Sequence, residues 1–470
     1  MNKIRFSFLL SFELALIDFL IFYPGIFSMD SIHMYIQAAT GEFSDIHSVF
    51  LPIMAFLVLK IAGGVDVLIF LACLFGFFGV WRLTFAILRF LQVRKNLQEW
   101  VVCFILLVFA SPLTPFPVYL VTLWTDTWLA IFLLWLIASF FELSLPEPKT
   151  NHALLFRVSL LITLILLIRS NTFILYPVLA AVTIILTWNG GFSRKALGVA
   201  VICPFLIYLS FQYIQYKVIK VDRYHTERVA FALDLASIYT YDPSICENAD
   251  LQTCRIFAKG LPSGFQVGQG AIDHTLNQSL DYADPVFVEL IVSPNLADDL
   301  LATATRHPGT YVVIKCLNFW DYIRPRDQYY YQSFIYPNSF GLVFNEPFGG
   351  IRDLFLSALH RVYRHPLLRF LSFVHLPWIA IDLACIAYCL AYRKRSAPLG
   401  KLGLIFLVPA SYSFSYLIVL TASDFRFIYP SLVLMQVITL TFCFSFVANR
   451  VSQFKDRVCN LGEPSAHFEG

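Results

Sequence analysis

The apolar stretch Ser48–Ala62, SVFLPIMAFLVLKIA, decides how the rest of the chain is arranged. A helix needs about 20 apolar residues to cross the hydrocarbon core of a bilayer, so this stretch is short for a crossing. If it crosses, every later segment changes sides compared with an arrangement in which it rests along the membrane surface. The orientation of the whole chain therefore depends on this one segment.

The distribution of Lys and Arg resolves the choice, because cytoplasmic loops of membrane proteins are enriched in both residues. If 48–62 rests along the outer surface, the short outer loops keep only Lys60, Arg169 and Arg426. The cytoplasmic segments then hold Lys3, Arg5, Arg89, Arg94, Lys95, Lys149, Arg157, Arg194, Lys195, Arg393, Lys394, Arg395, Lys401, Arg450, Lys455 and Arg457. A crossing would remove this bias, so the sequence predicts a surface helix here and both termini in the cytoplasm.

The composition is that of an integral membrane protein. Apolar residues make up 58% of the chain and charged residues 14%, whereas a soluble domain has about 45–50% and about 25%. Apolar stretches suited to spans lie at 6–23, 65–88, 98–119, 127–143, 154–169, 171–188, 196–214, 372–392, 402–421 and 427–447. We predict an all-α polytopic membrane protein with about ten transmembrane helices. A net charge of +3, with no basic run among aromatics, gives no support for a nucleic-acid partner.

These spans divide the chain into four parts. Residues 1–214 form an N-terminal transmembrane module with a first outer loop at 24–64 and a second, short one at 120–126. After an extracytoplasmic domain, the C-terminal transmembrane helices occupy 372–449, and 450–470 form a cytoplasmic tail.

The extracytoplasmic domain is predicted at 215–371, where charged, Pro and Gly residues return to ordinary frequency. Cys246 and Cys254 lie eight residues apart in its polar part, which favours a local disulfide over free thiols in an oxidising compartment. Its last part, Ile351–Arg369, interleaves Arg and His with Leu and Phe. We expect that stretch to rest on anionic lipid headgroups or on a lipid phosphate.

Two isolated acids are predicted at the outer face. Asp30 follows the first span in Tyr23–Ser31, YPGIFSMDS, and begins an amphipathic helix that ends at Gly41. It is a candidate helix N-cap and a candidate general base whose pKa partial burial raises toward a useful value, and one residue can have both roles. Asp126 opens another span after Trp124, where it either balances the helix dipole or belongs to a site.

A weaker signal stands in the first outer loop, where Asp45 and His47 form an Asp-x-His element. These two side chains are candidates for orienting a substrate or binding a metal. Plain solvation at the surface is an equal alternative for them.

Two arginines, Arg169 and Arg426, stand at predicted outer turns and run against the charge bias. A guanidinium binds phosphate bidentately, which makes both residues candidate phosphate ligands. The alternative is an ion pair with Asp424 or Asp126.

These elements together resemble the GT-C class of integral membrane glycosyltransferases, which use polyprenyl-phosphate-linked sugars. The resemblance lies in Pro24-Gly25-x4-Asp30-Ser31, Gly41-x3-Asp45-x-His47, Leu123-Trp124-x-Asp126, Arg169-x-Asn171 and Asp424-x-Arg426-x3-Pro430. It implies juxtamembrane helices in the first outer loop and a variable late outer domain. The chain departs from related bacterial sequences at Thr125, where Lys is frequent, and at Ser48, where Pro is common after the His.

The implied reaction is inverting transfer of a hexose or pentose from a polyprenyl-phosphate donor. The acceptor would be an extracytoplasmic glycan of the cell envelope, such as lipopolysaccharide, or another lipid-linked molecule. By this resemblance Asp30 is the catalytic base, Asp126 orients the acceptor or a divalent cation (Mg²⁺ or Mn²⁺), and Arg426 contacts the donor phosphate. The site would face the periplasm or exterior of the cytoplasmic (inner) membrane.

Two other functions stay open at this point. An O-antigen ligase or polymerase would rely on residues of the large loop, here His360, Arg364 and His365. A transporter or flippase would favour charges midway through spans, internal repeats and broken helices. No repeat is visible in the sequence, and there is no Walker A motif to couple transport to a nucleotide.

Overall fold

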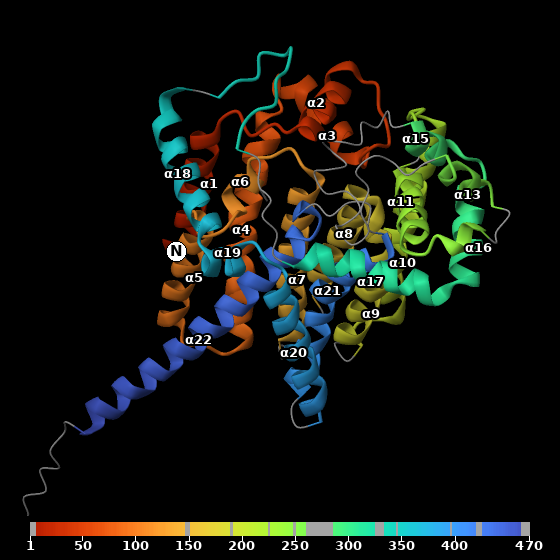
Figure 1. Cartoon of the computed structure of the whole chain (residues 1–470). Helices are drawn as coiled ribbons and strands as arrows, with labels where there is room; N and C mark the ends of the chain where they lie inside the picture. The colour runs from red at the N-terminus through yellow and green to blue at the C-terminus, as the bar shows by residue number, and fades with distance from the viewer. Residues whose placement is uncertain are drawn as a thin grey trace, which may run out of the picture.

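The computed structural model describes residues 6–145, 151–188, 191–223, 226–247, 251–259, 285–324, 333–344, 346–394, 397–419 and 425–461. The regular structure within these ranges is helical (Figure 1). Their β-type pairs are two isolated bridges, Ile26 with Thr122 and Ser44 with Asp222. The predicted all-α class is therefore confirmed for the part of the chain that the structure describes.

Five helices in these ranges are long and apolar enough to cross a membrane. They are α4 (Asp66–Phe90), α7 (Thr125–Ser144), α10 (Arg194–Lys217), α21 (Ala397–Val419) and α22 (Tyr429–Leu461). A sixth span results if α19 (Pro366–Ser372) and α20 (Leu376–Tyr392), which meet at a bend of 51°, are counted as one. By length and composition the structure thus has five or six candidate spans, and the predicted count of ten is not confirmed.

The other predicted spans are helices that are shorter than a bilayer core. They are α1 (Phe6–Phe22), α5 (Lys95–Ala110), α8 (His152–Ile168) and α9 (Tyr176–Thr187). At about 1.5 Å per residue, even the 17 residues of α1 and α8 extend over only about 25 Å, whereas the hydrocarbon core is about 30 Å thick.

The predicted span 98–119 is wrong as a single helix, because α5 covers only its first part. The helix stops at Ala110, and the chain turns through Ser111 before the short helix α6 (Phe116–Leu120). Prolines at 112, 115 and 117 explain the break, because proline cannot continue an α-helix and keeps the preceding residue out of the helical region. The residues after Ala110 therefore do not continue α5, and the ring of Tyr119 in α6 lies 5.1 Å from that of Trp124, just before α7.

Helix α7 lies at the centre of the bundle and is buried along most of its length, packed between α4, α8 and α22. At one end of the bundle, the top of Figure 1, helices α2 (Met29–Thr40) and α3 (Phe50–Ala62) pack against each other. We call this the site end. Most of the stretch 48–62 forms this 13-residue helix α3, which is about 20 Å long and, like α1, α5, α8 and α9, is shorter than a bilayer core.

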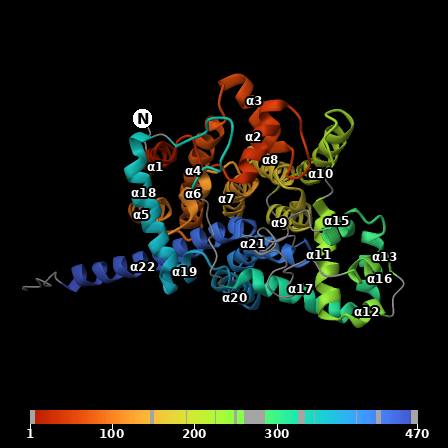
Figure 2. The same ribbon diagram turned by 45° about the horizontal axis from the view of Figure 1, so that its top comes forward.

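The late polar segment builds a second hydrophobic core beside the bundle (Figure 2). Its helices are α11 (Thr226–Tyr241), α12 (Ser244–Glu247), α13 (Gln252–Phe257), α15 (Pro285–Val292), α16 (Leu296–Arg306) and α17 (Pro308–Ile323). We call them the second helical unit. Cys246 and Cys254 form the predicted disulfide within it.

The predicted amphipathic stretch 351–369 is divided between α18 (Gly349–Arg364) and α19, because Pro366 starts a new helix after His365. Helix α18 lies along α1, with the rings of Phe355 and Phe22 5.7 Å apart. Helix α22 continues past the predicted start of the tail, and its C-terminal part projects away from the bundle in both views.

Candidate functional site

The site begins where the chain leaves α1 and runs beside the loop that precedes α7. The Ile26 N–H donates to the Val121 carbonyl at 2.7 Å. Gly25 permits this contact, because its φ is +128° and a Cβ there would lie 3.0 Å from the Val121 oxygen. Two segments almost a hundred residues apart in sequence are therefore joined just before each of them starts a helix.

Ser28 and Trp124 form a second contact between these two segments. The Ser28 hydroxyl caps α2 by accepting the Ser31 N–H, and it also accepts the Trp124 indole N–H at 2.7 Å. Ser28, rather than Asp30, is thus the N-cap, which makes the N-cap interpretation of Asp30 wrong. Asp30 lies in the first turn of α2 and Asp126 in the first turn of α7, so both predicted acids are at the site end.

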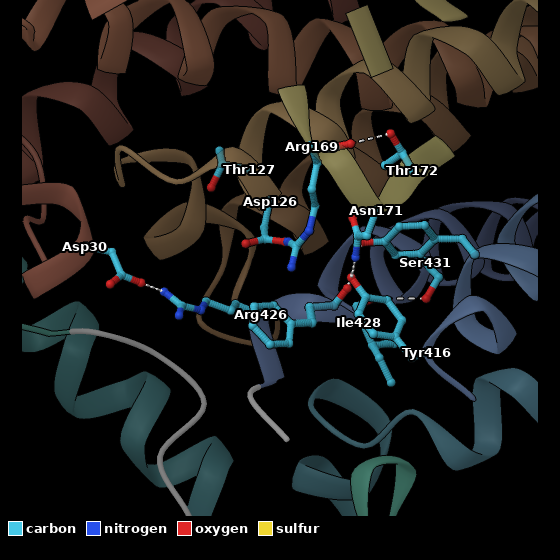
Figure 3. A network of polar contacts seen from close by, with 12 residues as sticks. Asp30, Asp126, Thr127, Arg169, Asn171, Thr172, Tyr416, Arg426, Ile428 and Ser431 are labelled. Atoms are coloured by element: carbon cyan, nitrogen blue, oxygen red, sulfur yellow. Dashed lines mark hydrogen bonds and ion pairs between the residues drawn. The ribbon is translucent and has the colours of Figure 1, made fainter. Parts of the chain in front are cut away.

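Asp30 forms an ion pair with Arg426 (Figure 3). Arg426 lies in the 3₁₀ turn η3 (Phe425–Phe427), and the second carboxylate oxygen of Asp30 is 3.5 Å from His47 Nε2. The Arg426 guanidinium also lies over the Trp124 ring, 5.7 Å from its centroid. Three residues predicted separately, Asp30, His47 and Arg426, therefore meet.

The pKa of Asp30 lies well below its usual range. Burial by itself would raise it, but the charge of Arg426 and the hydrogen bond from His47 outweigh burial. The expectation that burial raises this pKa is wrong for the structure as it stands, because it considered burial without the cation that the fold brings in.

Asp126 forms the second ion pair, with Arg169 (Figure 3). The Asp126 residue is 3% exposed, and Arg169 precedes the 3₁₀ turn η1 (Ser170–Leu175) after α8. The guanidinium of Arg169 lies 4.6 Å from the centroid of the Phe427 ring, and that of Arg426 lies 5.3 Å from the same centroid. One aromatic ring thus places the two ion pairs side by side.

Hydrogen bonds from α21 hold this arrangement in place. Tyr412 donates its hydroxyl to the Phe427 carbonyl at 2.7 Å, and its oxygen is 3.0 Å from the Tyr416 hydroxyl. The Asn171 amide donates to Tyr416 at 3.2 Å. Neither tyrosine is among the residues predicted for the site. The available signal was a Tyr pair at i and i+4 within an apolar stretch, a spacing that puts both on one helix face.

Of the first-loop pair, the structure brings only His47 to the ion pairs. The Asp45 carboxylate accepts from the Tyr216 hydroxyl at 3.1 Å, and the Asp45 N–H donates to the Asp222 carbonyl at 3.0 Å. Asp45 therefore ties the first loop to α10 and to the segment that follows it. His365 of the large loop has a structural contact as well, because its Nδ1 accepts the Leu368 N–H at 3.4 Å at the start of α19.

The described residues around Asp126 do not form a set of ligands for a divalent cation. Within the described ranges, no group of three or more His, Cys, Asp or Glu side chains is placed to hold a metal ion. Asp126 points to Arg169, whereas Mg²⁺ requires near-octahedral oxygen ligands. The predicted metal at Asp126 stays a prediction, and no step below depends on it.

Searches of this chain against models of protein families, against curated proteins and against solved structures gave no match in any of the three comparisons.

Proposed function

We propose that the chain is a membrane glycosyltransferase that moves a sugar from a polyprenyl-phosphate donor to an acceptor at the site end. One observation carries the proposal. Two Asp–Arg pairs, Asp30 with Arg426 and Asp126 with Arg169, come from four separate segments and meet on the ring of Phe427.

Fold stability alone is a poor explanation for this cluster. Removing charges from water costs several kcal/mol per ion, and buried pairs can often be replaced by apolar residues without loss of stability. Ionisable groups at the end of an apolar bundle are more often part of a substrate or ion site. The two pairs therefore favour a binding or catalytic function for this end of the bundle.

Arg426 links donor binding to activation of the base. A phosphate would compete with Asp30 for the guanidinium, which binds oxyanions bidentately. Once Arg426 turns to the phosphate, Asp30 loses the charge that lowers its pKa, while its burial remains. Donor binding would thus convert a weakly basic carboxylate into one that can accept a proton.

The chemical step requires little else from the protein. The acceptor hydroxyl oxygen bonds to the anomeric carbon, the bond from that carbon to the phosphate oxygen breaks, and the phosphate leaves with the electron pair. The hydroxyl proton passes to Asp30, and the charge on the leaving phosphate is stabilised by Arg426. Asp126, held by Arg169, would orient the acceptor, and His47 would orient Asp30.

The proposal includes the finer topology. In it the short helices α1, α5, α8 and α9 also cross the inner membrane, which gives about ten spans and cytoplasmic termini. The site end then faces the periplasm or exterior, where the second helical unit also lies, and the acceptor is a glycan or lipid of the cell envelope.

Transfer by the purified full chain in liposomes tests the proposal. Polyprenyl-phosphate donors carrying labelled hexoses or pentoses are supplied with an envelope lipid fraction, and labelled product is measured. Product that depends on Asp30 and Arg426 supports the proposal. Movement of the intact donor between leaflets, with no labelled product from any donor, would refute it and favour a flippase.

A further inference from the structure

Helix α17 has an apolar exposed face, and its buried face combines polar residues with Ile314, Phe319, Tyr322 and Ile323. Among its described side chains, Lys315 and Asn318 are buried, with Lys315 only 7% exposed. Its exposed face is apolar, with side chains 37–57% exposed at Val312, Val313, Leu317 and Trp320. A helix at a water-facing surface instead has polar side chains on its exposed face, and a lysine is almost never fully buried without a partner.

The buried side of α17 is held in a fixed orientation. Lys315 Nζ lies 2.5 Å from the Asp234 carboxylate of α11, and it donates to the Ile418 carbonyl of α21 at 3.1 Å. Rotating α17 to expose Lys315 would break both contacts and leave the Asp234 carboxylate buried without its cation. The apolar face therefore points outward as a stable feature of the fold.

Contacts with α21 show the depth at which α17 lies. The ring of Phe319 stacks on Phe414 at 5.5 Å, and Tyr322 lies 5.4 Å from Tyr416. The apolar part of α21 ends at Ile418, so these contacts fall within about 6 Å of the end of a candidate span. Figure 1 shows α17 running across α21 at this level.

We propose that α17 lies in the plane of the membrane, with its Val312–Trp320 face buried among lipid acyl chains of the leaflet at the site end. Lipid is the expected partner of this face because α17 contacts the last turns of a candidate span and its exposed side is apolar. Exposed arginines at both ends, Arg306 before the helix and Arg324 after it, are placed for headgroup phosphates. The second helical unit is thereby held at the bilayer surface beside the site. This inference needs α21 to span the membrane, but it does not depend on sugar transfer.

Spin labels on the full-length chain test the inference. The chain is reconstituted into liposomes of phosphatidylcholine and phosphatidylglycerol, with its free cysteines replaced and the Cys246–Cys254 disulfide kept. Nitroxides are placed one at a time at positions 313, 317 and 320. The matched control is position 298, where Asp298 is exposed on α16 of the same helical unit.

Collision with oxygen, which concentrates in lipid, is compared with collision with a water-soluble nickel chelate. The oxygen-to-nickel ratio should be higher at 313, 317 and 320 than at 298. Oxygen-to-nickel ratios at 313, 317 and 320 that are as low as the ratio at 298 would overturn the inference, because the face would then be in water. Low collision with both reagents, with spin–spin broadening, would also overturn it, because a second copy of the chain would cover the face. In a second chain that keeps native Cys316, which is exposed on the same helix, a nitroxide at this cysteine should show the same high oxygen-to-nickel ratio without substitution of any of the four apolar residues.

Discussion

Replacing Asp30 by asparagine tests whether its carboxylate is a catalytic base or has only a structural role. Asp30→Asn keeps the size of the side chain, and it leaves the cap of α2 intact because Ser28 provides it. The change removes the proton acceptor and the counter-charge of Arg426. General acid–base catalysis contributes about 10²–10⁴-fold, so turnover should fall by that factor.

The effect on stability should be moderate. The side chains of Asp30 and Arg426 are 27% and 20% exposed, so the pair lies between a surface pair and a buried one. Surface pairs contribute about 0–1 kcal/mol, and breaking a buried pair costs about 3–5 kcal/mol. We therefore expect Asp30→Asn to lower the free energy of unfolding by about 1–3 kcal/mol, which leaves the variant folded for assay.

The double variant Asp30→Asn with Arg426→Gln makes the test decisive. It also removes the cation with which Asp30 pairs, so the stability lost in the single variant should largely return, whereas sugar transfer should not. Glu42→Gln, which neutralises an exposed acid of the same loop, is the control for charge and should transfer at the normal rate. The assay is transfer of labelled sugar in liposomes, with unfolding followed on the same samples. Full turnover by Asp30→Asn at normal expression would refute the reasoning and favour the ligase that uses the large loop.

Four further predictions follow from the described contacts. Asp126→Asn should lower the free energy of unfolding by about 3–5 kcal/mol, because Arg169 is left in a largely buried site, and Asp126→Asn with Arg169→Gln should recover part of this loss in thermal unfolding. Folding lowers the pKa of Asp30, so the stability that this carboxylate contributes is complete above its unfolded pKa of about 3.9 and is lost as pH falls below that value. The difference in unfolding free energy between wild type and Asp30→Asn should therefore stay constant from pH 7 to 5 and shrink below about pH 4. A nonreducing peptide map should show Cys246 linked to Cys254, and reduction should destabilise the second helical unit by about 3 kcal/mol at most, since the closed loop is short. An impermeant maleimide added to intact cells should label a single cysteine at the exposed position 340 but not one at 394, and the reverse pattern would place the site end in the cytoplasm.

Local signals in the sequence were enough for several elements. Helix α2 ends where Gly41 adopts a left-handed φ of 76°, a conformation that glycine reaches without strain. The disulfide joins cysteines that are only eight residues apart, so its geometry depends on a short segment. The short helix of 13 residues within 48–62 also follows from the sequence, because the apolar stretch there is short, whereas the prediction that it rests on the outer surface depends on the Lys and Arg distribution and stays a prediction. Helix α5 shows the limit of hydropathy, because its apolar stretch continues through three prolines that end the helix early.

The sequence by itself determined the helical class, the positions of the two acids at helix starts, and two isolated arginines that need anionic partners. Only the tertiary structure decided that Arg426 pairs with Asp30, 396 residues away, and Arg169 with Asp126. It also decided the direction in which the pKa of Asp30 shifts from its ordinary value, because that direction depends on whether burial or a nearby cation dominates. Helix periodicity and caps act over a few residues, whereas ion pairing at the end of a bundle depends on how whole helices pack, which no local pattern encodes.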